Sequence, residues 1–228
     1  MNNKKLKIAL QKSGRLSEDS MNLLKKCGIR FSNGLGKLRT ETENFPLEIY
    51  FLRDDDIPEY VADGVADLGI VGENVLAENQ KNVCIIEPLN FGKCRLSLAV
   101  PKNFAYQTVK DFEGKRIATS YPNILRKFFA SHGVKTEIHT ISGSVEIAPS
   151  IGLADAVCDL VSSGSTLFSN GLREVETVMN SEAVLVSRQN LEADQAILFE
   201  LHQRLIIGLY LLSEDGLSDV VLKGRSGA

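Results

Sequence analysis

The sequence predicts an α/β protein with two lobes and a cleft between them, and three observations lead to this prediction. Short apolar runs alternate with amphipathic segments along most of the chain, which is typical of strands joined by helices. The alternation restarts after Pro101, which indicates a second α/β series. We expect a late apolar run at residues 183–187 to return to the first lobe. In such a protein the cleft between the lobes is the default binding site.

The first lobe is expected to comprise residues 1–100 together with 184–212. Its first helix is well marked, because Ser17 is a favourable residue for opening a helix and Gly28 for closing one. Gly69 and Gly72 accompany a compact apolar run that suits a buried strand. In chain order, we expect strands at residues 6–10, 48–53, 68–71, 83–88 and 95–101, and helices at 17–27, 57–63, 75–79 and 192–212.

The second lobe is expected at residues 101–183. Pro122 favours the first turn of a helix, where its missing N–H leaves no hydrogen bond unmade. Residues 213–228 lose the periodicity and are expected to form an irregular tail. We expect strands at residues 114–119, 134–140, 156–161 and 174–179, and helices at 122–132, 148–153 and 166–170.

Composition and charge narrow the class of protein. The 228 residues are 43% hydrophobic, enough for a sizeable core, and the net charge of −3 gives no reason to expect nucleic-acid or anionic-membrane binding. Lys7 interrupts the apolar stretch after the basic N-terminus, so we expect no export signal. No run approaches the roughly 20 apolar residues that span a bilayer. We therefore expect a cytoplasmic protein with no membrane partner.

The cysteines and histidines are not expected to carry the chemistry. Cys27, Cys84, Cys94 and Cys158 occur singly, with no C-x-x-C pair, so reduced thiols are expected rather than a zinc site. Cys158 lies in an apolar strand and is expected to be a small buried hydrophobic residue. The three histidines are expected to be structural or surface residues.

The most informative segment is the strand at 156–161, which runs into small polar residues and then a helix. Small residues let backbone N–H groups approach a phosphate, hydroxyls add donors, and a helix N-terminus adds partial positive charge. Asp159 can accept hydrogen bonds from ribose hydroxyls. The alternative is a Ser/Gly turn with an ordinary helix cap. The residues of this predicted phosphate loop are Ser162, Ser163, Gly164, Ser165 and Thr166.

The phosphate loop and six other blocks resemble the ATP phosphoribosyltransferase family in their order and spacing. The loop continues into Asn-Gly-Leu-Arg-Glu at 170–174, as in that family's phosphoribosyl pyrophosphate loop, and the seven blocks together cover most of residues 6–188. The resemblance implies a fold of the type II periplasmic-binding-protein kind. It also implies transfer of phosphoribose to N1 of ATP in the first step of histidine biosynthesis. The other blocks lie at residues 9–16, 52–58, 63–76, 91–96, 118–122 and 143–149.

The resemblance further implies the residues that bind ATP, namely Lys12, Arg15, Arg53, Gly72 and Tyr121. Lys12 and Arg15 surround a glycine, and such a turn suits a polyphosphate; the resemblance places Arg15 on the phosphates of ATP or the leaving pyrophosphate. Gly72 is assigned to adenine by resemblance alone, because its run is otherwise a core strand. Tyr121 is either a nucleotide contact or a core aromatic residue.

Two residues are expected to be catalytic, Arg15 and, by resemblance, Glu146 near the ribose. We expect no simple general base, since attack by N1 needs alignment and pyrophosphate stabilisation, followed by proton loss from the N6 amino group. The aspartates at 54–56 suit Mg²⁺, but we favour their capping the next helix and neutralising Arg53. Mg²⁺ is expected through substrate phosphates, with no metal-ligating residues.

Two other functions fit parts of the pattern. One is a two-lobed solute-binding module that binds a small anion without chemistry, and the other is a phosphoribosyltransferase with a different acceptor. The chain lacks the G-x-x-x-x-G-K-[ST] motif, which fits an enzyme that uses ATP as a nucleophile rather than cleaving it.

The resemblance also bears on regulation and assembly. Residues 11–15 and Tyr121-Pro122 resemble the family's long form, yet the chain stops near the start of that form's regulatory domain. We therefore expect a catalytic core without the C-terminal regulatory domain, with absent or weakened inhibition by histidine. A homodimer is implied, with higher oligomers when a regulatory domain or subunit is present.

Overall fold

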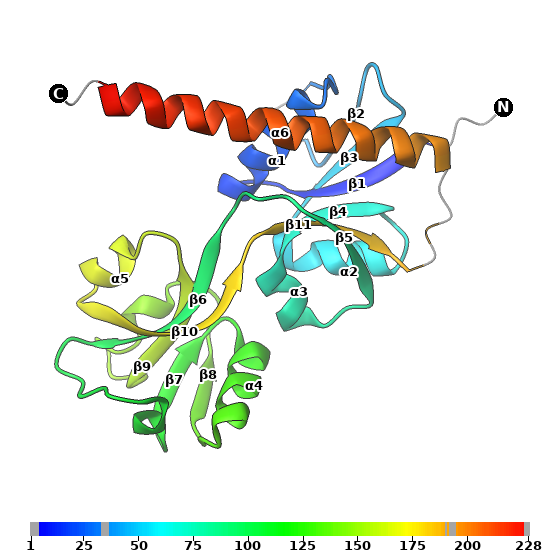
Figure 1. The fold of residues 1–228 in the computed structure, drawn as a ribbon. Coiled ribbons are helices and arrows are strands. Elements are labelled where there is room, and N and C mark those ends of the chain that lie inside the picture. The colour runs from blue at the N-terminus through cyan, green and yellow to red at the C-terminus, as the bar shows by residue number, and fades with distance from the viewer. Residues whose placement is uncertain (1–4, 33–36, 190, 192–194, 226–228) are drawn as a thin grey trace. The chain divides into compact units, whose positions relative to one another are not determined.

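The computed structural model describes residues 5–32, 37–189, 191 and 195–225, with side chains as far as residue 213. The chain divides into two compact units. Unit 1 consists of Met1–Gly72, Lys81–Gly92 and Ala183–Ala228, and unit 2 of Glu73–Gln80 and Lys93–Glu182. Each unit has its own β-sheet with helices packed on it, as Figure 1 shows, which confirms the predicted α/β class.

Unit 1 is built on a six-stranded sheet in the order β2-β3-β1-β4-β11-β5. The three strands β3, β1 and β4 are parallel, whereas β2, β11 and β5 run antiparallel to their neighbours. The strands are β1 (Leu6–Gln11), β2 (Arg39–Glu41), β3 (Leu47–Leu52), β4 (Leu68–Gly72), β5 (Val83–Pro88) and β11 (Ala183–Arg188). The helices are α1 (Arg15–Lys26), the 3-10 helix η1 (Asp54–Asp56), α2 (Ile57–Ala62) and α6 (Gln195–Arg225).

Unit 2 is built on a five-stranded sheet in the order β10-β6-β9-β7-β8. Strands β9, β7 and β8 are parallel, and the pairs β6–β9 and β10–β6 are antiparallel. The strands are β6 (Cys94–Pro101), β7 (Arg116–Thr119), β8 (Glu137–Thr140), β9 (Ala156–Val161) and β10 (Leu172–Ser181). The helices are α3 (Glu73–Asn79), η2 (Val109–Phe112), α4 (Pro122–His132), η3 (Val145–Ile147) and α5 (Ser165–Ser169).

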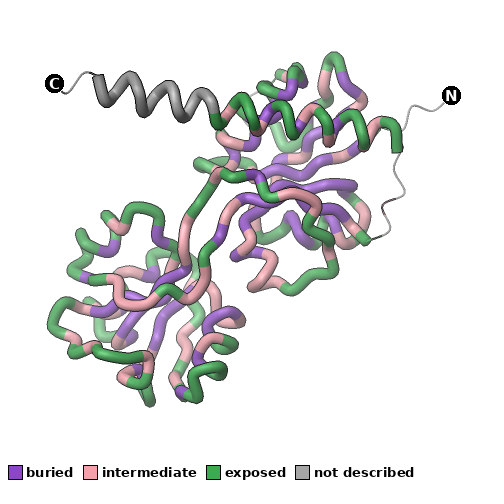
Figure 2. Tube along the Cα trace, viewed as in Figure 1, coloured by how far each residue is buried: buried purple, intermediate pink, exposed green. Residues whose placement is uncertain are grey.

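Both sheets are buried by apolar side chains, and the buried residues follow the strands in Figure 2. In unit 2 the alternation of side chains along a strand separates two clusters. Leu98 and Ile117 belong to a cluster with Phe129 of α4, whereas Ala99 and Val157 belong to a cluster with Leu167 of α5. The unit 2 sheet is therefore covered on both faces, as expected for a sheet with parallel strands.

The predicted boundary between the lobes was wrong for two elements. Strand β6 was expected in the first lobe, which was to extend to residue 100, but it pairs with β9 and β10 in unit 2. Helix α3 also belongs to unit 2. Strand pairing is a long-range property, so an apolar run alone does not reveal which sheet will receive it.

Two further predictions are corrected by the structure. Residues 148–153 do not form the expected helix. Gly152 has a φ of 76°, which a right-handed helix does not allow, and the segment is a series of turns after η3. The expected irregular tail from residue 213 is instead a continuation of α6 to Arg225. The expected helix start at residue 192 lies outside the described residues.

Helix α6 is unusually apolar for its exposure. By length and composition, Gln195–Ser213 could cross a membrane, with a mean hydropathy of 1.3 and 17% of the window buried. Its residues Leu201 and Leu205 are fully buried in the core of unit 1. At Gly208 the helix passes very close to α1, where a β-carbon would lie 2.6 Å from Cys27 Sγ and 3.1 Å from Leu23 Cδ1.

This close approach predicts the effect of a substitution at Gly208. Alanine normally stabilises a helix by up to about 1 kcal/mol relative to glycine. We expect the opposite here, a loss of about 1–3 kcal/mol in the free energy of unfolding, because the added methyl group overpacks the contact. Chemical denaturation of Gly208→Ala measures it. Lys127→Ala, at an exposed helical position outside α6, is the control and should change stability by about 0.5 kcal/mol or less. A Gly208→Ala protein as stable as the wild type would contradict the contact.

Candidate functional site

Three of the predicted ATP-binding residues lie at one edge of the unit 1 sheet. Strands β1 and β3 are parallel and pair Gln11 with Leu52, so Lys12 and Arg53 follow immediately at the carboxyl ends of neighbouring strands. The backbone N–H of Lys12 donates to the carbonyl of Leu52 at 2.8 Å and fixes this register. Gly72 is the last residue of β4, which runs parallel to β1 on its other side. Ligands of open α/β sheets bind at this carboxyl edge.

The same edge carries the start of helix α1. Gly14 precedes the helix with a φ of 90°, a conformation that favours glycine, and Arg15 is the first helical residue. The side chains of Lys12 and Arg15 are both exposed. The N-terminus of this 12-residue helix adds a partial positive charge to the two cations. Together these groups can bind a polyphosphate.

The aspartate run beside Arg53 forms the 3-10 helix η1 ahead of α2. Among the described residues, Asp56 precedes α2 without a capping hydrogen bond from its side chain, so the expected cap was wrong. The carboxylates instead lie in the first turn before α2, where negative charge is favourable.

In unit 2 the predicted phosphate loop lies at the carboxyl end of β9. Gly164 has a φ of 80° and turns the chain into α5. Ser162, Ser163, Ser165 and Thr166 are exposed. The hydroxyl groups of Ser163 and Ser165 are 3.0 Å apart, which gathers donors on a short stretch of chain.

A hollow of about 570 Å³ adjoins the phosphate loop within unit 2. Lys102 and Arg173 bring two cations to it, and Lys102 Nζ lies 4.5 Å from the centroid of the Phe168 ring. A compact anion is the ligand that such a lining favours. The hollow is lined by Lys102, Ser163, Gly164, Ser165, Leu167, Phe168, Leu172, Arg173 and Glu174.

Two carboxylates accompany the loop. Glu146 lies in η3 beyond the end of β8, and Asp159 lies in β9; both are half-buried. Burial, and to a smaller extent the charge of Glu146, raise the pKa of Asp159, although the backbone N–H of Leu160 donates to Asp159 Oδ1 at 2.8 Å. Such a pair can accept hydrogen bonds from the hydroxyls of a sugar. The structure thus brings Glu146, Asp159 and the loop to one region of unit 2.

Tyr121 lies after β7, at the same edge of the unit 2 sheet as the phosphate loop. Asn74 Nδ2 donates to Tyr121 Oη at 3.3 Å, and the Ser181 hydroxyl donates to Asn74 Oδ1 at 2.8 Å. The Asn74 and Ser181 side chains are buried, so they fix the phenol in place. Asn74 was not among the site residues predicted from the sequence. It lies two residues after Gly72 in the same block, and this position could have indicated it.

Two further features concern the thiol of Cys158 and possible metal ligands. Cys158 is fully buried, and this burial raises the pKa of its thiol, so it is the expected small core residue. Within the described part of the chain, no three His, Cys, Asp or Glu side chains form a group that could hold a metal ion.

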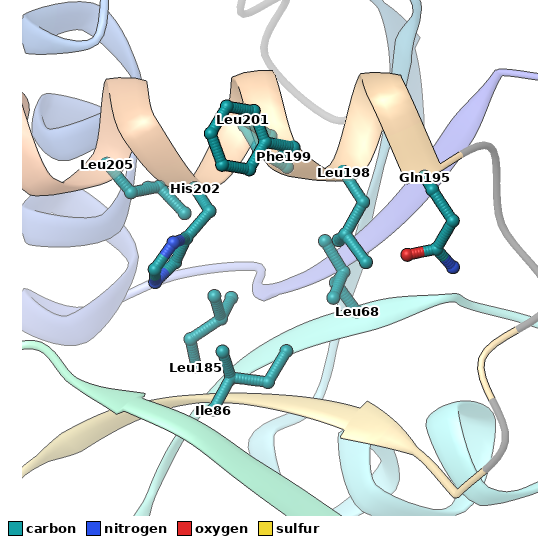
Figure 3. A pocket seen from close by; sticks show the side chains of 9 residues that line it. All are labelled: Leu68, Ile86, Leu185, Gln195, Leu198, Phe199, Leu201, His202 and Leu205. Atoms are coloured by element: carbon teal, nitrogen blue, oxygen red, sulfur yellow. The ribbon is translucent and has the colours of Figure 1, made fainter.

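A second hollow, of about 240 Å³, lies within unit 1 between α6 and the sheet (Figure 3). Its lining is almost entirely apolar, with Leu68, Ile86 and Leu185 facing Leu198 and Leu205. His202 is close to Glu87, with Nε2 3.6 Å from a carboxylate oxygen. The lining offers no arginine or lysine to a phosphate, so this hollow does not suit the predicted substrates.

Comparison with known proteins identifies the family. Residues 53–206 match the family model described as HisG, ATP phosphoribosyltransferase. An ATP phosphoribosyltransferase of Cytophaga hutchinsonii is 59% identical over 201 residues, which cover 88% of this chain and 70% of the relative. One of Maricaulis maris is 50% identical over 196 residues, covering 83% of this chain and 67% of that protein.

Solved structures agree on the fold. The ATP phosphoribosyltransferase (HisG:HisZ) complex of Thermotoga maritima matches with a TM-score of 0.77 and 29% identity, covering 90% of this chain and 98% of the matched chain. An alkanesulfonate-binding protein of Xanthomonas axonopodis matches with a TM-score of 0.58 and 18% identity, over 98% of this chain and 80% of that one, which confirms the expected periplasmic-binding-protein-like fold. The chain therefore belongs to the ATP phosphoribosyltransferase family, and it is an enzyme that transfers the phosphoribosyl group of phosphoribosyl pyrophosphate to ATP in the first step of histidine biosynthesis.

Proposed function

We propose that unit 2 holds phosphoribosyl pyrophosphate, with its 5′-phosphate on the phosphate loop. The observation that carries this proposal is the collection of exposed hydroxyls at the carboxyl end of β9, next to a hollow that includes Lys102 and Arg173. Four hydroxyls and the backbone around Gly164 offer donors to a dianionic phosphate, and the two cations lower the cost of binding it.

Asp159 and Glu146 bind the ribose in this proposal. Ribose hydroxyls are donors, and two half-buried carboxylates are matched acceptors for them. Positive charge develops at the anomeric carbon as the bond to pyrophosphate breaks. The same carboxylates stabilise that charge, and this is the role we propose for Glu146.

The unit 1 edge binds ATP. Lys12 and Arg15 contact its phosphates or the leaving pyrophosphate, Arg53 adds a third cation, and Gly72 lets adenine approach the end of β4. We assign Tyr121 to the nucleotide as well. The lone pair of adenine N1 attacks the anomeric carbon, pyrophosphate departs with the electrons of the broken C–O bond, and the N6 amino group then loses a proton. Lys12 and Arg15 stabilise the charge that grows on the leaving group.

Mg²⁺ enters the proposal through the substrates. The described residues offer no three-ligand protein site, and Mg²⁺ is commonly held by substrate phosphates with one or two carboxylates. When bound, it would neutralise the pyrophosphate through the phosphate oxygens. We further propose that the enzyme acts in the cytoplasm, where its four cysteines would remain reduced thiols.

Asp159→Asn tests the ribose assignment. Loss of a charged hydrogen bond to the substrate should lower kcat/KM for phosphoribosyl pyrophosphate about 10- to 100-fold, corresponding to roughly 1.5–3 kcal/mol. The KM for ATP should change less than about twofold, as initial-rate kinetics with each substrate varied would show. A matched variant, Asp63→Asn, lies outside the proposed site and is expected to behave as wild type. An unchanged kcat/KM for Asp159→Asn would refute the assignment.

We expect Asp159→Asn to increase the stability of the protein, although it lowers activity. The pKa of Asp159 is raised in the folded state, so the folded protein keeps this proton to higher pH than the unfolded chain does. Ionisation therefore costs stability above the unfolded pKa, and this cost is absent at lower pH. We expect Asp159→Asn to raise Tm at pH 7 and the gain to shrink as the pH falls toward about 4. A lower Tm at pH 7 would show that the carboxylate is stabilising instead.

We also propose that the chain forms a homodimer through helix α6. Exposed Phe199, Ile206, Ile207 and Tyr210 give this helix an apolar surface of the kind that marks protein interfaces. Light scattering coupled to gel filtration should give about 50 kDa, twice the mass of the 25.0 kDa chain. Ile207→Glu combined with Tyr210→Glu should reduce this to the monomer mass, and Gln107→Glu, at an exposed position outside α6, should not. A wild-type protein that elutes as a monomer would exclude the dimer.

A further inference from the structure

An arginine outside the proposed substrate contacts reaches the start of the phosphate loop. Arg95 opens β6, and its Nη1 donates to the backbone carbonyl of Ser162 at 3.4 Å. The rest of the guanidinium is held by Glu174 of β10, which accepts from Nε at 2.5 Å and from Nη2 at 2.6 Å. One planar group thus joins the carboxylate of one strand to the first residue of the loop.

The carboxylate of Glu174 is itself held by a hydrogen bond from β6. The hydroxyl of Ser97, two residues after Arg95 on β6, donates to Glu174 Oε1 at 2.8 Å. Ser97 is fully buried, so this hydroxyl belongs to the rigid part of the sheet. The hydrogen bonds from Arg95, with a smaller contribution from Ser97, hold the pKa of Glu174 below its usual range. Glu174 therefore remains an anion that orients Arg95.

The order of the strands explains why this group can act on the loop. Strand β6 lies between β10 and β9, and Arg95 pairs with Val161, the last residue of β9. A side chain at this position can reach the carboxylate on one side and the loop that leaves β9 on the other. Glu174 also lines the hollow beside the loop. Without Arg95, Glu174 would lose the ion pair that offsets its charge beside this hollow.

We propose that Arg95 is a positioning residue for phosphoribosyl pyrophosphate, with Glu174 and Ser97 as its support. Arg95 holds the carbonyl of Ser162 and so sets the conformation in which the loop meets the 5′-phosphate, and it neutralises Glu174 at the edge of the phosphate hollow. This proposal rests on the assignment of the loop to phosphoribosyl pyrophosphate. It adds residues that are not expected to touch either substrate.

Arg95→Lys is the sharpest test, because lysine keeps the charge and can still pair with Glu174. A single ammonium group cannot reproduce the planar fork that reaches Glu174 and Ser162 together. We expect the KM for phosphoribosyl pyrophosphate to rise about 5- to 10-fold, while the KM for ATP stays within about twofold. Amide hydrogen exchange of a peptide spanning residues 162–166, measured without substrates, should become faster.

Arg116→Lys provides a matched control in the same sheet. Arg116 of β7 makes the same kind of contact, to the carboxylate of Asp155 at 2.8 Å and to the carbonyl of Gly152 at 3.0 Å, but not to the phosphate loop. We expect it to leave both KM values and the exchange of residues 162–166 unchanged. Thermal unfolding of both variants shows whether each is folded.

The outcomes distinguish the positioning role of Arg95 from the assignment of the loop to phosphoribosyl pyrophosphate. Wild-type exchange and a wild-type KM in Arg95→Lys would overturn the positioning role. Faster loop exchange with an unchanged KM for phosphoribosyl pyrophosphate would instead overturn the loop as the substrate site, and with it the catalytic relevance of Arg95. Equal increases in both KM values, or the same effects in Arg116→Lys, would show a general structural role and also overturn the proposal. Should Arg95→Lys fail to fold, Ser97→Ala tests the same support and is expected to give a smaller change in the same direction.

Discussion

Each proposed binding edge depends on the parallel pairing of strands in its own sheet. In unit 1, the register that pairs Gln11 with Leu52 puts Lys12 and Arg53 on one edge. In unit 2, the parallel β7 and β9 likewise put Tyr121 and the phosphate loop at one edge. Parallel strands all end on the same side, so residues far apart in sequence are collected without any direct bond between them. A slip of one residue would turn each of these side chains to the other face.

Much of this arrangement could be predicted from the sequence, because it follows from local signals. Apolar runs and helix boundaries gave most of the elements, and the phosphate loop was recognisable from its small polar residues after β9. Strand β6 was assigned to the wrong unit because its partners are distant in sequence. The contact from Arg95 to Ser162 spans 67 residues, and no local pattern reports such a distance. Helix α6 continues past its predicted end at residue 212, although the sequence beyond it lacks an amphipathic period.

Asp159 in unit 2 shows how a group suited to binding a sugar can lower the stability of the folded protein. Burial raises the pKa of Asp159, so its charged form is held in an environment that disfavours it. Arg95 lies on the same strand pair, yet its charge is directed to Glu174 and not to Asp159. A cation beside Asp159 would stabilise the free protein, but in the proposed assignment it would compete with ribose for the same oxygen atoms. A sugar-binding site requires such a carboxylate, which lowers the stability of the free protein but has no cation competing for its oxygen atoms.

In the proposal each unit receives a different part of the substrates. The charged and polar side chains of the two units differ accordingly. The donors of unit 2 lie on a short loop, and the rigidity of that loop depends on its neighbours, because hydroxyls and backbone groups are effective only when they are aimed together. Arg95 provides this from β6 through a carbonyl, so it can set the loop conformation while leaving the hydroxyls available to a phosphate. Lys12 and Arg15 of unit 1 are long, exposed cations that can follow a leaving group as it moves. In the proposed assignment, the transfer reaction therefore makes two complementary demands, a fixed loop for the retained phosphate and long side chains for the departing pyrophosphate.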